Sequence, residues 1–297
     1  FKQKTAYEIY QCDWSSDVCS SDLKFARNVR VTTHPTKTSS AGPSGNPMLL
    51  AIDVGNTQTV FGLFDGDRIA EQFRVGTDRA HTADELAIML RAFVDLQSLD
   101  GIVLSSTVPQ LIREYESFAE RWAGVDLLVL GPGVATGIPI RYDDPREVGP
   151  DRIANAVAAR DRHGAPAIVV DFGTSTNFDI VSAAGEYLGG VLAPGIEISM
   201  DALFARAARL LKVPFEAPAN VIGKTTTQGL QSGLVYGFAG QVDGIVDRVR
   251  DELRAPDAPV IATGGLATLI TPHSRTITAI DPELTLHGLR LVWERNA

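Results

Sequence analysis

Cysteine is rare in this chain, and long hydrophobic runs are absent from it. The 297 residues include two cysteines, Cys12 and Cys19, so neither disulfides nor cysteine-based zinc sites are expected in the rest of the chain. No apolar run approaches the roughly 20 residues of a membrane-spanning helix. We therefore expect no membrane partner, and the shortage of cysteine favours a reducing, cytoplasmic location.

Positive charge and histidine are also scarce. The formal net charge is −9, which argues against a nucleic-acid partner. The histidines form no i, i+4 pair and no cluster with cysteine, so no histidine metal site or histidine-centred triad is predicted. They are His34, His81, His163, His273 and His287. Gly223-Lys224-Thr225 looks like the end of a P-loop, but Pro218 occupies the place of that motif's first glycine, which excludes a P-loop.

Residues 1–47 differ from the remainder. They contain no methionine and no sustained periodicity, and Met48 directly precedes the first expected strand. The segment 7–23 resembles a translated sequencing adapter. We expect 1–47 to be non-native, with a disordered native extension as the alternative.

One short sequence motif occurs twice in the chain. The segment Leu50–Thr57 reads LAIDVGNT, and Ile168–Ser175 reads IVVDFGTS. Each copy is an apolar run that ends in Asp-x-Gly and is followed by a second apolar stretch, a pattern typical of a β-hairpin. Glycine and small polar residues at its tip leave backbone N–H groups open to a phosphate. Two such hairpins predict a nucleotide bound between two related domains, and hence phosphoryl transfer.

The expected secondary structure repeats as well. Three strands are followed by alternating helices and strands, and the order restarts at Ala167. This pattern predicts α/β halves, 48–164 and 165–297, each with a mixed sheet flanked by helices. The first helix begins at a Thr82/Glu85 capping box, and its expected apolar face is Ile88, Leu90, Phe93 and Leu96. Further helices are expected at 110–122, 152–163, 198–211, 233–253 and 284–293.

The two hairpin turns carry the first candidate site residues. Asp53 is placed to orient Mg²⁺ or its waters, and Gly55 lets the main chain approach phosphates. Asp171 and Gly173 are the equivalents in the second half. Gly264-Gly265 follows an expected strand and suits an adenosine lying close to the backbone, although a plain tight turn has the same sequence.

Gly149-Pro150-Asp151-Arg152 precedes an alanine-rich helix and holds the candidate base. Asp151 has two interpretations: an ordinary helix N-cap, or a carboxylate that accepts the proton of an attacking hydroxyl. In the second interpretation Arg152 binds an anionic group of the substrate. The hydroxyl run Thr225–Thr227 lines the acceptor pocket or caps the following helix.

Taken together and in this order, these motifs resemble the type III pantothenate kinases, members of the acetate and sugar kinase/Hsp70/actin superfamily. The resemblance covers essentially all of 48–297. It rests on Asp53–Thr57, Gly149–Arg152, Asp171–Thr174, Gly189–Gly195, Ile222–Thr226 with Gln231–Gly233, and Thr263–Gly265. It implies two duplicated actin-like (ribonuclease H-like) domains, each with a mixed five-stranded sheet, and ATP-dependent phosphorylation of the 4′-hydroxyl of pantothenate, the first step of coenzyme A biosynthesis.

The resemblance also implies a role for each site residue. Asp151 is the general base, and Asp171 ligates a monovalent cation, K⁺ or NH₄⁺, that acts beside Mg²⁺. The ATP-binding residues are Asp53, Val54, Gly55, Asn56, Thr57, Gln58, Thr59, Val60 and Thr174. Pantothenate is held by Tyr142, Gly149, Pro150, Asp151, Arg152 and Thr226. A homodimer is implied, with the acceptor site near an interface that the small-residue helix 233–253 helps to build.

Two departures from the family pattern concern polar residues. The second hairpin reads Thr174-Ser175-Thr176-Asn177, where the family usually has Thr-Ala-Thr-Thr, and Lys224-Thr225 replaces a common Lys-Asn. Neither departure removes a charged catalytic group, so activity is expected. Cation preference is the property that these departures are most expected to alter. The alternatives left open are a sugar kinase and a non-catalytic nucleotide-binding regulator of the same fold.

Overall fold

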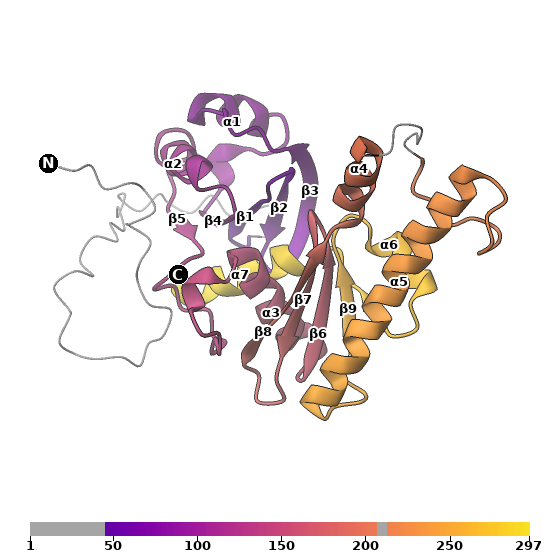
Figure 1. The fold of residues 1–297 in the computed structure, drawn as a ribbon. Helices are drawn as coiled ribbons and strands as arrows, with labels where there is room; N and C mark the ends of the chain where they lie inside the picture. The colour runs from indigo at the N-terminus through magenta and orange to yellow at the C-terminus, as the bar shows by residue number, and fades with distance from the viewer. Residues whose placement is uncertain (1–44, 207–212) are drawn as a thin grey trace, which may run out of the picture. The chain divides into compact units, whose positions relative to one another are not determined.

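The computed structural model describes residues 45–206 and 213–297. Nearly all of the expected non-native segment 1–47, and the end of the helix expected at 198–211, lie outside the described residues. Two five-stranded mixed sheets are formed, with strand orders β3-β2-β1-β4-β5 and β10-β9-β6-β7-β8, so each contains the same antiparallel hairpin beside a parallel strand (Figure 1). The predicted pair of mixed five-stranded sheets is confirmed.

The first compact unit contains residues 45–137, 143–154 and 285–297. Its strands are β1 (Met48–Val54), β2 (Gln58–Asp65), β3 (Arg68–Gly76), β4 (Gly101–Ser106) and β5 (Leu127–Val129). Its helices are α1 (Ala83–Leu90), α2 (Pro109–Phe118), which a π-helical turn (Ala119–Ala123) continues, and most of α7 (Leu284–Asn296). Short 3₁₀ turns lie at Leu96–Ser98 and Pro145–Glu147.

Helix α1 begins as predicted but buries a different face. Thr82 and Glu85 form the expected capping box. The helix ends at Leu90, and its buried residues follow the i, i+3, i+4, i+7 spacing of a single stripe: Ala83, Leu86, Ala87 and Leu90. Ile88 and Phe93, expected on that face, are 74% and 46% exposed, so this part of the prediction was wrong. Ile88 lies off the stripe, and Phe93 lies beyond the helix end.

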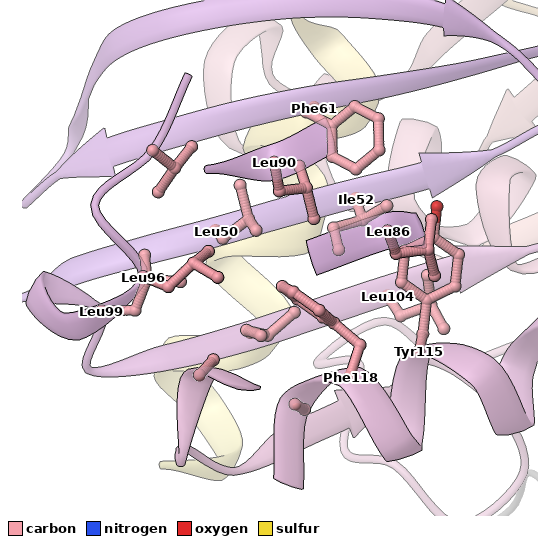
Figure 2. Packing of buried hydrophobic residues seen from close by; sticks show 14 of the residues in the cluster. Leu50, Ile52, Phe61, Leu86, Leu90, Leu96, Leu99, Leu104, Tyr115 and Phe118 are labelled. Carbon is pink, nitrogen blue, oxygen red and sulfur yellow. The ribbon is translucent and has the colours of Figure 1, made fainter. Parts of the chain in front are cut away.

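The core of the first unit lies between its sheet and helices α1 and α2. Figure 2 shows Tyr115 and Phe118 of α2 directed toward the strands that carry Ile52 and Leu104. All four side chains are essentially inaccessible to solvent. Packing of this kind holds β1 rigidly, and with it the turn that follows Val54.

The C-terminal helix α7 also packs on the first sheet, although it follows the second half in sequence. Gly62 of β2 and Gly101 of β4 make this possible, because a Cβ atom at Gly62 would lie 2.8 Å from Leu286, and one at Gly101 would overlap the ring of Trp293. The chain passes between the compact units after Gly137, Tyr142, Ala154 and Leu284.

The second unit contains residues 138–142 and 155–284. Its strands are β6 (Ala167–Phe172), β7 (Ser175–Val181), β8 (Tyr187–Pro194), β9 (Val260–Thr263) and β10 (Ala279–Ile280). Its helices are the larger part of α3 (Pro150–His163), then α4 (Ile196–Arg206), α5 (Thr226–Leu253) and α6 (Ala267–Ile270). A 3₁₀ turn lies at Thr271–His273. Among the residues that the structure describes, none of the helices combines the length and the hydrophobicity of a membrane span.

The two faces of the second sheet differ in character. One face, with Val170 and Phe178, forms an apolar core with α5 and α6, and α5 runs along the sheet in Figure 1. The other face carries Asp171, Asn177 and Asp179 among apolar residues, because side chains alternate along β6 and β7. Helix α5 begins at Thr226 rather than at Gly233, since Thr225 caps it by accepting a hydrogen bond from the N–H of Gln228.

Candidate functional site

The first Asp-x-Gly turn is held in place by two threonines that follow neighbouring strands. The N–H of Gly55 donates to the carbonyl of Gln58 at 3.0 Å. Thr77, after β3, donates through Oγ1 to the carbonyl of Gly55 (2.8 Å) and through its N–H to that of Thr57 (2.9 Å). Thr107, after β4, donates through its N–H to the carbonyl of Val54 at 2.9 Å. The main chain of this turn is therefore preorganised.

The predicted nucleotide residues of this turn fall into two groups. Asn56, Thr57 and Gln58 are exposed at the tip, and Asp53 is half-buried. Val54 and Thr59 are 0% and 2% exposed, so both residues are buried in the structure.

The second turn is packed between two glycines. Gly264 has φ +87°, and a Cβ atom there would lie 2.5 Å from Oδ1 of Asp171. A Cβ atom at Gly195, after β8, would overlap the carbonyl oxygens of Gly173 and Thr174. Both positions require glycine because backbone lies directly against the turn. The glycine turn predicted after β9 thus forms part of the same structure as Asp171.

Helix α3 orients the Asp171 carboxylate. Asn155, 1% exposed, donates from Nδ2 to Oδ2 of Asp171 at 3.3 Å. Asn177 is the direct cross-strand partner of Asp171, so the two side chains share one face of the sheet. Asn177 is 9% exposed, and its Oδ1 has no hydrogen-bond partner within the described part of the chain. One rung further along, the hydroxyl of Tyr187 donates to Asp179 at 3.0 Å.

Asp151 lies in the first turn of α3, in the first compact unit. Its Oδ1 accepts a hydrogen bond from the N–H of the next residue, Arg152, at 2.9 Å, which is not the N2 or N3 bond of an ordinary N-cap. A Cβ atom at Gly149 would overlap Oδ1 of Asp151, so glycine gives the carboxylate room. Burial raises the pKa of Asp151 above its ordinary value of 3.8, although the N–H and the charge of Arg152 act against this shift.

The predicted pantothenate residues are distributed over both units. Gly149, Pro150, Asp151 and Arg152 are in the first unit, and Arg152 is 6% exposed. Tyr142 belongs to the second unit, where its ring lies against Gly189 of β8: a Cβ atom at Gly189 would be 2.9 Å from that ring. Thr226 is the exposed first residue of α5.

Several residues that shape these turns were not among the predicted site residues. Thr77 and Thr107 hold the first turn, and Asn155 orients Asp171. Two signals point to them: a hydroxyl residue just after a strand next to the hairpin, and a polar residue one helical turn after Asp151 in an alanine-rich helix.

The described residues contain no group of three or more His, Cys, Asp or Glu side chains that could hold a metal ion. Each carboxylate of the predicted site is therefore considered singly: Asp53 in the first turn, Asp171 in the second, and Asp151 at the start of α3. An ion bound by so few protein ligands takes the rest from a ligand or from water.

The fold defines the class of protein. Two mixed five-stranded sheets with helices on them are the actin-like architecture expected from the sequence. A Baf family protein from Campylobacter jejuni aligns with a TM-score of 0.56 at 18% identity, over 83% of this chain and 98% of that protein. Component A of (R)-2-hydroxyglutaryl-CoA dehydratase from Acidaminococcus fermentans gives 0.50 at 15% identity, over 83% and 96%. At these identities the likeness shows the fold alone.

Sequence comparison identifies the family. The family model described as type III pantothenate kinase matches residues 49–248. A type III pantothenate kinase from Acidothermus cellulolyticus is 55% identical over 255 residues, which cover 84% of this chain and 99% of that protein. Another from Frankia alni is 54% identical over 250 residues, covering 84% and 100%. The chain belongs to the type III pantothenate kinase family, as the motifs predicted.

Proposed function

We propose that this protein transfers the γ-phosphoryl group of ATP to the 4′-hydroxyl of pantothenate, with Asp151 as the general base. Membership of the kinase family supports the reaction and its place in coenzyme A biosynthesis. The observation that carries the residue assignment is the Asp151 carboxylate, whose pKa is raised by burial and which lies beside the buried Arg152.

In the proposed reaction, Asp151 takes the proton of the 4′-hydroxyl while the oxygen of that hydroxyl bonds to the γ-phosphorus. The bond between the γ-phosphorus and the β,γ-bridging oxygen breaks, and its electrons leave with ADP. A raised pKa brings a carboxylate closer to the pH at which it both accepts and releases a proton efficiently. A positioned base of this kind contributes a factor of about 10² to 10⁴ in rate. Arg152, with its fixed charge, is assigned to the carboxylate of pantothenate.

ATP is assigned to the two Asp-x-Gly turns. In the first, the exposed tip Asn56–Gln58 follows a main chain held by Thr77 and Thr107. In the second, Thr174 lies in a turn packed against Gly195 and Gly264. Preorganised turns of this type bind phosphate through backbone N–H groups without a large ordering cost.

The residues around Asp171 fit a monovalent cation. The Asp171 carboxylate lies on the same face of the sheet as Oδ1 of Asn177, which is buried and has no hydrogen-bond partner among the residues that the structure describes. Both groups supply oxygen atoms, the ligands that hard cations prefer. When bound, such a cation would offset the negative charge of the phosphates. Mg²⁺ is assigned to ATP and Asp53, because this ion takes one or two carboxylates together with phosphates.

A homodimer in the cytoplasm is part of the proposal. The resemblance to the family supports it, and so do exposed apolar side chains in the second unit. These are Leu192 (59% exposed) on the edge strand β8, and Val221 (64%) and Ile222 (81%) before α5.

The test is an assay of 4′-phosphopantothenate by mass spectrometry, with ATP, Mg²⁺ and K⁺ present. Product that depends on pantothenate, and that falls by about 10²-fold or more in Asp151→Asn, supports the proposal. ADP release with glucose as acceptor is the matched control and should not exceed the release without an acceptor. Absence of pantothenate-dependent product would reject the reaction, and full turnover by Asp151→Asn would reject the base.

A further inference from the structure

We propose that Arg79, in the loop between β3 and α1, binds the terminal phosphates of ATP. This inference rests on the proposed function, which assigns ATP to the first turn. Arg79 reaches the tip of that turn directly: its Nη2 donates to Oδ1 of Asn56 at 3.0 Å, and the side chain is exposed.

The loop that carries Arg79 is anchored at both ends. Thr77 is bound to the carbonyls of Gly55 and Thr57, and its Oγ1 also lies 2.9 Å from Oγ1 of Thr59. At the other end Thr82 caps α1. Between them, Asp78 accepts a hydrogen bond from the N–H of Ala80 at 2.9 Å. The backbone of Arg79 is therefore held beside the first Asp-x-Gly turn, while its exposed side chain can exchange one hydrogen-bond partner for another.

In the described first unit, arginine is the source of positive side-chain charge near the turn. The sequence contains no lysine between Thr38 and Leu211, so the first unit has no lysine to serve a phosphate. Asp53 adds a negative charge to the turn. Arg74 of β3, the cross-strand partner of Val60, donates to Oε1 of Gln58 at 3.2 Å. Arg74 and Arg79 of the described first unit thus both bond to tip residues, and Arg79 is the one that bonds to Asn56, directly after Gly55.

The present partner of Arg79 does not compete strongly with a phosphate. The bond to Asn56 is exposed and involves an uncharged amide oxygen, and it uses one of the five N–H donors of the guanidinium. Hydrogen bonds between arginine and phosphate are charge-assisted and frequently bidentate, so they are stronger than a bond to an amide. Arg79 would release Asn56, or keep it with one N–H, when a triphosphate binds.

The experiment compares Arg79→Ala, Arg79→Lys and Arg68→Ala by calorimetric titration with ATP, ADP and adenosine in the presence of Mg²⁺. Arg68 is a matched control, since it is an exposed arginine at the opposite end of β3. We expect Arg79→Ala to weaken ATP binding by a factor of about 10 to 100 and to leave adenosine binding within about 2-fold of wild type. Arg79→Lys should recover part of the loss, and Arg68→Ala should match wild type.

Two outcomes would overturn the inference: unchanged ATP affinity in Arg79→Ala, or an equal loss for adenosine, which would indicate a structural role. A Gly55→Ala variant separates this failure from failure of the proposed function. A Cβ atom at Gly55 would lie 3.0 Å from the carbonyl oxygen of Gln58, so the substitution disturbs the turn to which ATP is assigned and leaves Arg79 in place. If Gly55→Ala weakens ATP binding and Arg79→Ala does not, only the present inference falls. If neither weakens it, the assignment of ATP to this turn falls as well.

Discussion

Asn155 donates a hydrogen bond from Nδ2 to Oδ2 of Asp171, across 3.3 Å, from a helix to the end of a buried strand. Asn155 is 1% exposed, so the bond is sheltered from water. Gly264 lies against the other carboxylate oxygen, Oδ1. The orientation of Asp171 is therefore set from two sides, by one side chain and by one backbone turn.

The first prediction concerns Asn155. Replacing it with Ala removes the donor to Asp171 and leaves the carboxylate less well oriented. We expect kcat to fall about 10-fold, in line with loss of a hydrogen bond to a charged group, while the KM for pantothenate changes little. The measurement is steady-state kinetics over a range of K⁺ concentrations. A variant with wild-type kcat at every K⁺ concentration would show that the bond has no role in turnover.

The second prediction concerns Gly264. Gly264→Ala places a methyl group against Asp171 and Phe172, and it also forces alanine to φ +87°. Gly133→Ala is the matched control, since Gly133 has φ +90° with nothing within 4 Å of a Cβ atom. We expect the control to lose about 1 kcal/mol of unfolding free energy, from the backbone alone, and Gly264→Ala to lose about 1–3 kcal/mol more. Urea denaturation measures both, and equal losses would contradict the packing described for Gly264.

The third prediction follows from the raised pKa of Asp151. Burial is the main cause of the raised pKa. The folded protein therefore binds the proton of Asp151 more tightly than the unfolded chain does, so the protein becomes less stable as pH rises through the folded pKa and Asp151 ionises. Asp151→Asn should therefore be more stable than wild type at pH 7, despite its loss of activity. The difference should shrink as pH falls toward the ordinary aspartate value of 3.8. Thermal unfolding at several pH values tests this, and a variant less stable than wild type at pH 7 would contradict it.

The fourth prediction concerns Asp243 of α5, which anchors the segment Ser274–Thr276. Its Oδ1 accepts hydrogen bonds from the hydroxyls of Ser274 (2.7 Å) and Thr276 (2.8 Å), and from the N–H groups of Arg275 and Thr276 (both 3.1 Å). Burial acts to raise the pKa of Asp243, but these hydrogen bonds outweigh it and the pKa is lowered.

Asp243→Ala should therefore cost about 1–3 kcal/mol of unfolding free energy at pH 7, because several donors lose their acceptor together. A lowered pKa stabilises the fold above the unfolded value and loses that contribution as pH falls through the folded pKa. The deficit of the variant should thus be smaller at pH 3 than at pH 7. Urea denaturation at both pH values is the measurement, and a deficit that does not change with pH would contradict this account.

The local motifs were predictable because they depend on neighbouring residues. Asp53 and Asp171 each lie near the end of a buried apolar strand, two residues before a glycine, and an apolar run that ends in such a turn specifies a hairpin with little help from the rest of the chain. The Thr82/Glu85 cap is similarly local. The exposure of Phe93 was missed because hydrophobicity alone does not say where a helix ends, and that of Ile88 because it lies off the buried stripe of α1.

The order of residues along the chain was enough to predict the pair of Asp-x-Gly hairpins, the helix that begins near Asp151 and the family to which the chain belongs. Three contacts became known from the folded structure: α7 packs on the first sheet, Asn155 bonds to Asp171, and Gly195 and Gly264 lie directly against the second turn. These contacts join residues far apart in the chain, and their geometry depends on how closely backbones approach one another. No periodicity within a short segment carries that information, because packing is a property of surfaces that meet only in the folded state.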